Sequence, residues 1–298
     1  EADISAHVEA GKTFRLTACV NNVLSWDTIP PGQVLNLPDG RVKQQYFHDF
    51  FNYAGLHRSV WLYATPKAYI SDVTVVTEYD GKDGAVDYRV DTTAEGAVSV
   101  TLRDAAGKVV ATGAGASGSL KVVGATPWQP GKAYLYQLTV AYSGQNGVAD
   151  EYSLAVGIRS VKVDGKRFLI NGEPFYFKGF GKHEDSDIRG KAHDDALMVH
   201  DFSLMKWIGA NSFRTSHYPY AEEVLDYADR NGIVVINETA AVGLNMVIGK
   251  TLNPAVVEPA KLYSEEGISS RTQRSHANAI RELIARDKNH PCVVTWSI

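Results

Sequence analysis

A change of pattern near residue 160 constrains the fold of this chain more than any other feature. Before it, apolar residues recur at every second position in short runs, as in a half-buried strand. Three such runs stand out: Tyr136, Leu138, Val140 and Tyr142; Val98, Val100 and Leu102; Val86, Tyr88 and Val90. Turn residues separate the runs, so this part of the chain predicts an all-β sandwich.

The β region itself divides in two. Residues 1–66 contain expected strands and a long loop rich in Pro, Asn and Gly. Thr65-Pro66 then resembles a link to a second unit of immunoglobulin size, at 67–157.

After residue 160 short apolar runs alternate with amphipathic segments. Strands are expected at 175–177, 210–215, 233–236 and 293–298, and helices at 193–208, at 220–231 and around 280–284. The first helix has one apolar stripe, made of Met198, Phe202, Leu204, Met205 and Ile208. This alternation predicts a parallel sheet, with residues 158–298 as the first half of a (β/α)8 barrel. A doubly wound sheet is the alternative, but no strand is followed by the Gly-x-Gly-x-x-Gly turn of a dinucleotide site.

Composition excludes several classes of function. The net charge of −4 gives no reason to expect nucleic acid or an anionic membrane as partner, and no run of about 18 apolar residues predicts a membrane span. Cys19 and Cys292 lack metal-ligand spacing and are interpreted as buried free thiols. Half a barrel would leave a strand edge open, and the chain does not begin with Met, so we expect a piece of a longer protein.

Polar residues follow the expected strands, at the end where barrel enzymes place their sites. They occupy 178–187, 214–219 and 237–239. None of these segments has metal-ligand spacing or a nucleophilic serine elbow. Carboxylate, His and Arg side chains gathered at these strand ends, the mouth of the barrel, suit a sugar as ligand. Glycoside hydrolysis needs two carboxyl groups flanking one bond.

Each of these segments also has a purely structural interpretation. His183 and Glu184 suit an exposed loop equally well, and the run Glu184, Asp185 and Asp187 is more typical of a solvated loop than of a catalytic pair. Arg214 would neutralise a buried carboxylate, and His217 would be a turn residue. The glycosylation sequon at 237–239 ends an apolar run, so we expect it to be inaccessible.

Five long and unusual segments resemble the β-glucuronidases of glycoside hydrolase family two. They are Tyr46 to Val60, Lys178 to Gly190, Asn211 to Glu223, Arg286 to Pro291, and Val294 to Ile298. The resemblance implies a jelly-roll sugar-binding domain for 1–66, an immunoglobulin-like domain and then the barrel. It also implies a retaining exo-glycosidase that hydrolyses β-D-glucuronides to glucuronate and an alcohol, through a covalent intermediate and two glutamates.

The resemblance places neither catalytic glutamate within the chain. The acid/base residue would follow strand four, so we expect residues 299–301 to be Ala-Asn-Glu, with the nucleophile further on. Asn237-Glu238 is a similar pair, but it ends strand three, and we interpret Glu238 as a residue of the barrel mouth rather than the acid. The family more usually has Asp where Asn237 stands, a difference expected either to loosen a local charge pair or to create an adventitious sequon.

Four substrate-binding residues carry over from the resemblance. Asp49 matches a residue that binds sugar hydroxyls, and His183 and His217 match histidines at the mouths of strands one and two. Arg214 matches an arginine beside the nucleophile. The loop at 244–265 is expected to cover the leaving group.

Two other functions stay open at this point. A β-galactosidase of the same family would carry a metal-binding Glu-x-His after strand three, whereas residues 238–245 contain no such pair. A non-catalytic carbohydrate-binding protein is the second alternative. For the glucuronidase the resemblance implies small β-glucuronides as partners, a homotetramer, and neither metal nor cofactor.

Overall fold

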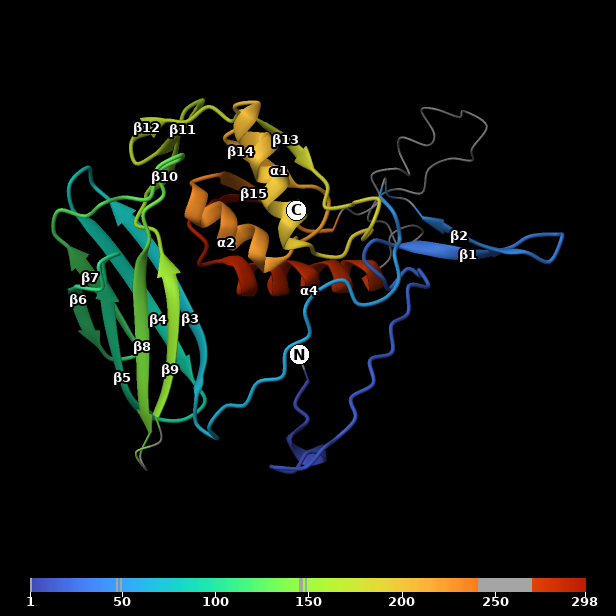
Figure 1. Ribbon diagram of the computed structural model, residues 1–298, viewed down its shortest axis with the longest axis horizontal. Helices are drawn as coiled ribbons and strands as arrows, with labels where there is room; N and C mark the ends of the chain where they lie inside the picture. Colours follow the sequence, from blue (N-terminus) through green and yellow to red (C-terminus); the bar gives the residue numbers. More distant parts are fainter. Residues whose placement is uncertain (1, 47, 49, 145–146, 148, 241–269) are drawn as a thin grey trace.

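The chain forms a β-sandwich and a strand–helix body side by side, and a hairpin projects away from both (Figure 1). The computed structural model describes residues 2–46, 48, 50–144, 147, 149–240 and 270–298. No helix among them combines the length and the apolar character needed to cross a membrane.

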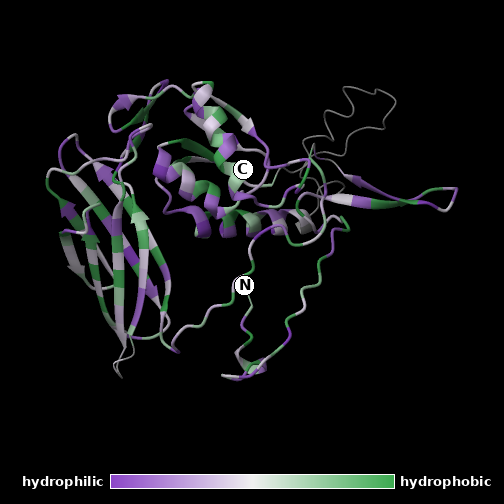
Figure 2. Cartoon of the chain, in the orientation of Figure 1, coloured by the Kyte–Doolittle hydropathy of each residue, from purple (hydrophilic) through white to green (hydrophobic). Residues whose placement is uncertain are grey.

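Seven antiparallel strands build the sandwich: β3 (Ile70–Tyr79), β4 (Gly84–Thr92), β5 (Gly96–Arg103), β6 (Val109–Ala114), β7 (Ser117–Val122), β8 (Tyr136–Gly144) and β9 (Ala149–Val156). One sheet has the order β3-β4-β7 and the other has the order β6-β5-β8-β9. The period-two prediction is confirmed, because the three predicted apolar runs all lie in the sandwich core. Hydropathy alternates along these strands, as Figure 2 shows.

The strand–helix body begins with a small antiparallel sheet of β10 (Val161–Asp164), β11 (Arg167–Ile170) and β12 (Glu173–Pro174). Four parallel strands follow, in the order β13 (Gly179–Lys182), β14 (Ser212–Thr215), β15 (Val234–Glu238) and β16 (Val293–Ser297). Helices α1 (Asp195–Trp207), α2 (Glu222–Asn231) and α4 (Ser270–Asp287) lie between strands in the chain. Strand order equals chain order, as the alternation predicts for consecutive β/α units.

The first parallel strand was predicted four residues too early. Phe175 donates its backbone N–H to Phe168, which extends the small sheet instead of starting the large one. Phe175 and Phe177 pack edge to face with centroids 4.9 Å apart, against the core of the strand–helix body. β13 itself is Gly-Phe-Gly-Lys, because a Cβ at Gly179 or Gly181 would collide with β14 or the loop after it.

Helix α1 starts at a capped turn, with Asp194 accepting a hydrogen bond from the backbone of Leu197. Met198, Phe202 and Met205 are buried as predicted. Leu204 and Ile208 were assigned to the same stripe, but they are 44% and 59% exposed. They border a hollow beside β13, the edge strand of the four-stranded sheet.

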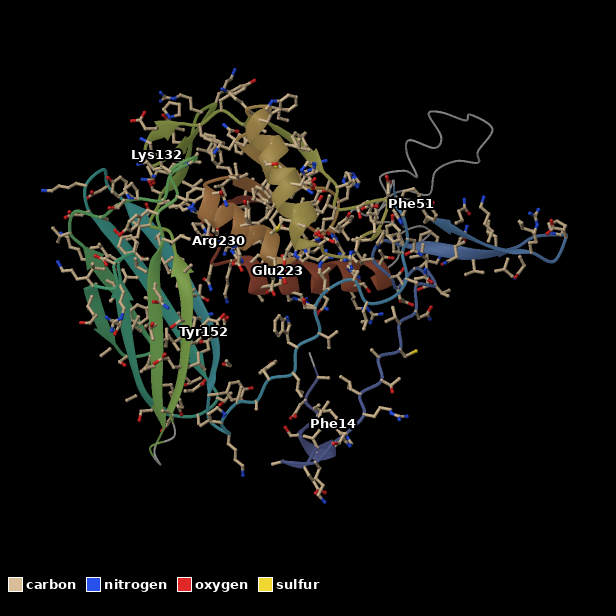
Figure 3. The ribbon with its side chains drawn as sticks, in the orientation of Figure 1. Phe14, Phe51, Lys132, Tyr152, Glu223 and Arg230 are labelled. Carbon is tan, nitrogen blue, oxygen red and sulfur yellow. The ribbon has the colours of Figure 1, made fainter. Side chains whose placement is uncertain are left out.

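Residues 2–66 contain the hairpin of β1 (Gly32–Asn36) and β2 (Val42–Tyr46) and one short 3-10 turn, η1 (Ser5–His7), but otherwise no regular structure in their described part. The strands of a jelly roll are therefore not seen there. Phe14 and Phe51 stand out from this part of the chain, 42% and 66% exposed (Figure 3). Cys19 is exposed, so its interpretation as a buried thiol was wrong, whereas Cys292 is buried as expected.

The segment after α4 joins the two bodies. The Asn289 side chain donates to the carbonyl of Val73 and accepts from the N–H of Val75, so it pairs with the free edge of β3 as a neighbouring strand would. Lys288 forms an ion pair with Asp72 on the same strand. The loop after α2 joins the contact, because Gly131 donates its N–H to Gly232. Gly232 has a left-handed φ of 67°, and a Cβ there would lie 2.6 Å from the Gly131 nitrogen.

His290 in this segment has a raised pKa. Burial alone would lower it, but the hydrogen bond and charge of Asp229, helped by Asp287 and Asp226, raise it overall. Nδ1 of His290 lies 2.6 Å from Oδ2 of Asp229, and both side chains are largely buried. A histidine with a raised pKa in the folded state stabilises it fully below its unfolded pKa of about 6.5. This contribution is lost as the pH rises through the folded value.

We therefore predict that His290 makes unfolding depend on pH above about 6.5. The free energy of unfolding, measured by urea denaturation between pH 6 and pH 9, should fall with pH more steeply in the unmodified protein than in His290→Gln. Glutamine can still donate a hydrogen bond to Asp229 but does not titrate. Equal slopes in the two proteins would contradict the prediction.

Candidate active site at the ends of the parallel strands

The carboxylate of Glu238 is the centre of the candidate site. It lies at the carboxyl end of β15, where it forms an ion pair with Arg214 and hydrogen bonds with two other side chains of the neighbouring strand ends. Arg214 Nε lies 3.0 Å from Oε2, His217 Nδ1 lies 2.9 Å from Oε1, and Ser297 Oγ donates to Oε2 at 2.8 Å. Both oxygens are therefore occupied, which suits a carboxylate that holds its neighbours in place better than one that transfers a proton to substrate.

Three of the predicted binding residues meet here. Arg214 and His217 share Glu238, and the ring of His183 lies edge to face with that of His217, with centroids 5.4 Å apart. His183 and Arg214 keep contact with solvent, as groups that meet a substrate must. A Cβ at Gly181 would lie 2.3 Å from Ser216 Oγ, so glycine at this position lets the loop after β14 approach β13 closely.

The fourth predicted residue, Asp49, lies outside the described residues. Its neighbour Phe50 is buried and stacks on His217 with centroids 6.2 Å apart, and it meets Tyr218 edge to face at 5.1 Å. Phe50, the residue after Asp49, therefore reaches the strand ends. The loop predicted at 244–265 also lies outside the described residues.

Glu184 is not part of a solvated loop, and that interpretation of the acidic run was wrong for it. Its side chain is 8% exposed and lies 2.5 Å from Arg58 Nη2. Its other oxygen accepts from the N–H of Ala221, where α2 begins. Negative charge is favoured at a helix N-terminus, so Glu184 joins the N-terminal segment, the loop after β13 and α2.

A lysine and a tyrosine pack together beside this ion pair. Lys191 Nζ lies 3.2 Å from the centroid of the Tyr218 ring, a cation–π contact, and Tyr218 donates its hydroxyl to Asp185 at 2.9 Å. Burial lowers the pKa of Lys191 to about 8. Burial, with the charge of Asp185, raises the pKa of Tyr218, so its hydroxyl remains a donor. Asp185 is thus paired as well.

Asn237 lies beneath the site and is fully buried. Its amide donates to Asp287 at 2.7 Å and accepts from the Thr215 hydroxyl at 3.2 Å. The sequon at 237–239 is therefore inaccessible in the folded chain, as expected. Both ends of the Asn237 amide are hydrogen bonded, and the expectation that asparagine loosens a charge pair here stays a prediction.

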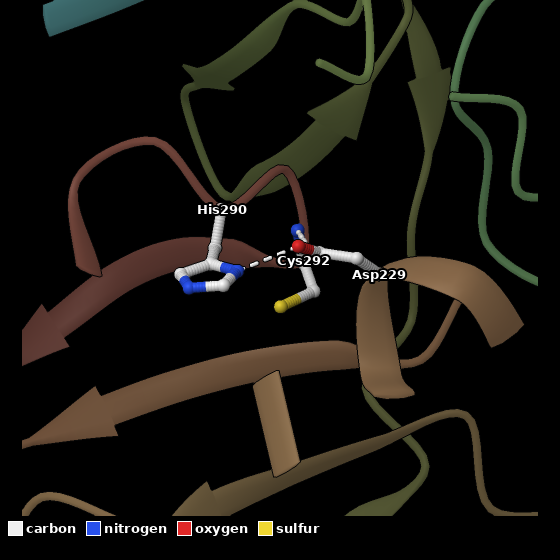
Figure 4. A group of neighbouring side chains, drawn as sticks. All are labelled: Asp229, His290 and Cys292. Atoms are coloured by element: carbon white, nitrogen blue, oxygen red, sulfur yellow. Dashed lines mark hydrogen bonds and ion pairs between the residues drawn. The ribbon is translucent and has the colours of Figure 1, made fainter. Parts of the chain in front are cut away.

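One group of potential metal ligands occurs among the residues that the structure describes: Asp229, His290 and Cys292 (Figure 4). Its atoms are already engaged, since Asp229 accepts from His290 Nδ1 and from the N–H of Cys292. Burial, with the charge of Asp229, raises the pKa of the Cys292 thiol. Arg159 donates to the carbonyls of Pro291 and Val293 on either side of it. A neutral thiol beside a guanidinium is a poor ligand for a cation. The group is therefore interpreted as side chains that stabilise the fold through hydrogen bonds.

Sequence reasoning missed Ser297 and the pair of Lys191 and Tyr218. Ser297 was read only as part of the last strand, although its place at a strand end is the signal that selected the other residues. Lys191 had no such signal, because it comes nine residues after β13 ends and reaches Tyr218 only through the fold of the loop.

Comparison with known families agrees with this geometry. The profile described as "Glycosyl hydrolases family 2, TIM barrel domain" matches residues 161–298, and the profile "Glycosyl hydrolases family 2" matches residues 68–159. The chain belongs to glycosyl hydrolase family 2. A multidomain fold of β and α/β parts is what this membership implies.

Curated relatives carry the name β-glucuronidase. One from Paenibacillus borealis is 53% identical over the whole of this chain and 50% of its own length, and one from Rattus norvegicus is 46% identical over the whole chain and 46% of its own length. The chain thus spans about half the length of the curated relatives it matches.

Solved structures give the same result. A β-D-glucuronidase of Dictyoglomus thermophilum superposes with a TM-score of 0.84 at 47% identity, over 93% of this chain and 47% of that one. A β-glucuronidase from Ruminococcus gnavus in complex with D-glucuronic acid gives 0.81 at 42% identity, over 93% and 45%.

Replacing the central carboxylate should destabilise the strand ends. In Glu238→Gln one oxygen becomes an amide N–H₂ that faces donors, so we expect unfolding to become about 2–3 kcal/mol easier, the exposure of Arg214 keeping the loss moderate. Denaturant titration would measure this. The matched control, Glu151→Gln, changes an exposed residue of β9 and should cost about 0.5 kcal/mol or less. A loss in Glu238→Gln no larger than in the control would refute the assigned role.

Proposed function

We propose that the protein to which this chain belongs is a retaining β-glucuronidase. It would hydrolyse β-D-glucuronides to glucuronate and an alcohol. The observation that carries the proposal is the meeting of Arg214, His217 and Glu238 at the ends of parallel strands. This arrangement occurs in a family 2 chain whose reported relatives are named β-glucuronidases.

The two reacting glutamates of this mechanism would lie beyond Ile298. One would protonate the leaving oxygen and then activate water, and the other would form the covalent glycosyl intermediate. The acid/base residue would follow Ser297 closely, with Ala-Asn-Glu at 299–301. Since Ser297 is bound to Glu238, the next residues would emerge at the same mouth.

The residues within the chain would hold the sugar. His183, His217 and Arg214 supply donors around one mouth, and Asp49 would accept hydrogen bonds from sugar hydroxyls. Arg214 Nε forms an ion pair with Glu238 and donates to Ser216 Oγ. Its side chain is 42% exposed, so its remaining N–H groups can serve a nearby carboxylate. That carboxylate would be the nucleophile, which a neighbouring positive charge keeps ionised.

Two finer expectations belong to the same proposal. Residues 1–66 would form part of a jelly-roll sugar-binding domain, for which the hairpin and the contact of Phe50 with His217 are the support. The protein would assemble as a homotetramer. A β-galactosidase is less well supported, because the reported relatives and structures are glucuronidases.

Substrate choice can be tested with paired aryl glycosides. The full-length protein should release the chromophore from an aryl β-glucuronide and leave the matching β-galactoside essentially uncleaved, because the galactoside lacks the C6 carboxylate that a glucuronidase must bind and has the opposite configuration at C4. Steady-state kcat/KM for each substrate is the measurement. Equal cleavage of both would refute the substrate assignment, and cleavage of neither would refute the enzyme.

Asp49 should be required for substrate binding and turnover. We expect Asp49→Ala to lower kcat/KM at least a hundredfold, because charge-assisted hydrogen bonds to the sugar are lost, with little change in Tm. Asp39→Ala, in the turn of the hairpin, is the matched control, because Asp39 is exposed and its partner among the described residues is Arg41. An Asp49→Ala protein with unchanged kcat/KM would remove Asp49 from the site.

A further inference from the structure

The ammonium group of Lys191 lies in a corner between two aromatic rings. Nζ is 3.2 Å from the centroid of the Tyr218 ring and 5.5 Å from that of the Phe50 ring. The two rings meet edge to face, with centroids 5.1 Å apart and an interplanar angle of 68°. Lys191 forms no ion pair among the residues that the structure describes, so the electron-rich ring faces take the place of a carboxylate.

The backbone on either side of Lys191 is held in place. Ser186 and Gly190 exchange both of their backbone hydrogen bonds, which closes the loop after β13 immediately before Lys191. The carbonyl of Lys191 accepts from Arg58 Nη1 at 3.1 Å, and Nη2 of the same guanidinium is paired with Glu184. A side chain that starts from a fixed backbone loses less conformational entropy when it settles between the rings.

The same two rings surround His217. The Phe50 ring stacks on the imidazole at an angle of 23°, with centroids 6.2 Å apart. Tyr218 is buried, and its hydroxyl is held by Asp185. The hydrogen bond from Nδ1 to Glu238 fixes one atom of the imidazole, but a ring can still tilt about a single bond. Packing against neighbouring rings is what fixes its plane.

We propose that Lys191 is a positioning residue: by holding Phe50 and Tyr218 together, it fixes the plane of His217 for binding of the sugar. The inference rests on the proposed function and adds a residue to it. Lys191 would act through the two rings and not by contact with the sugar. Its contribution is orientation, since a small displacement of a group that binds the substrate lowers turnover.

The role requires a charged lysine, because a neutral amine is not attracted to a ring face in the same way. Burial lowers the pKa of Lys191 to about 8, although the charge of Glu184 opposes this effect. The ammonium form is therefore present below about pH 8 and is lost above it. The charged and titratable groups that face it among the described residues are Glu184 and Asp185 of its own loop, His57 and Arg58 of the N-terminal segment, and Tyr218.

The first measurement is kcat/KM of the full-length protein for an aryl β-glucuronide at about pH 6.5. We expect Lys191→Met, which keeps the stem and loses the charge, to lower kcat/KM at least tenfold. Lys191→Arg should stay within about threefold of the unmodified protein, because a guanidinium is also a cation that stacks on aromatic rings. Lys166→Met, in the exposed turn between β10 and β11, is the matched control and should leave kcat/KM unchanged.

The second measurement follows the charge of Lys191 with pH. The ratio of kcat/KM in the unmodified protein to that in Lys191→Arg should be constant up to about pH 7 and should fall at least fivefold by about pH 9.5, because arginine stays protonated throughout this range. Groups that titrate in both proteins, the proposed reacting glutamates among them, cancel in the ratio. A lysine that only filled space would give a constant ratio.

A third measurement asks whether Lys191 acts through His217. His217→Asn places an amide near the position of Nδ1 and removes the ring on which Phe50 stacks. In this background Lys191→Met should change kcat/KM by less than about threefold, because residues that act as a unit are not additive. The same tenfold loss in both backgrounds would show that Lys191 does not act through His217, and would overturn the proposal.

These outcomes separate the positioning role from the proposed function. An unmodified full-length protein that does not cleave the glucuronide refutes the proposed function itself. An active protein in which Lys191→Met loses no more kcat/KM than Lys166→Met refutes the role of Lys191 alone. If Lys191→Met does not fold, the comparison with Lys191→Arg decides, and a ratio that is constant from pH 7 to pH 9.5 rules the role out.

Discussion

The contacts of the Glu238 carboxylate hold together the strand ends of the strand–helix body. Parallel strands bring their carboxyl ends to one edge of the sheet, where backbone pairing stops and side chains must complete the structure. Arg214 and His217 come from the end of β14, and Ser297 from the end of β16. One carboxylate can pair with the arginine and also hydrogen bond the histidine and the serine, so it joins three strand ends. Donors held in this way are oriented before any ligand arrives, which lowers the entropy cost of binding.

The segment 286–292 makes similar polar side-chain contacts away from the site. Its residues contact different parts of the molecule: Asp287 contacts β15, Asn289 the sandwich, and His290 α2. A short connection with so many partners has little freedom to change in sequence or length. This explains physically why a stretch with no evident role at the proposed sugar site has such a distinctive sequence.

Much of the fold could be predicted from the sequence, because burial has a direct sequence signal. Period-two runs gave the sandwich core, and apolar runs between amphipathic segments gave three of the four parallel strands. Phe175 and Phe177 misled because aromatic residues that pack ahead of a strand look the same as residues within one. The real first strand carries two glycines, whose purpose is close approach to β14, and it has almost no hydrophobic signal.

The site was harder to predict than the fold. Position at a strand end identified Arg214 and His217, but pairing across more than a hundred residues, as between Arg58 and Glu184, leaves no local trace. Cys19 and Leu204 were misjudged for the related reason that an apolar side chain does not reveal whether a neighbour covers it.

The contact of Asn289 with β3 also bears on how the two bodies can be separated. An uncovered outer strand is a template for pairing with other chains, and proteins protect such strands with charge or by covering them. Here one amide, with Lys288 beside it, covers the outer strand from another domain. A sandwich separated from the segment after α4 would lose this cover, so its colloidal behaviour in solution depends on a side chain about 130 residues further along the chain.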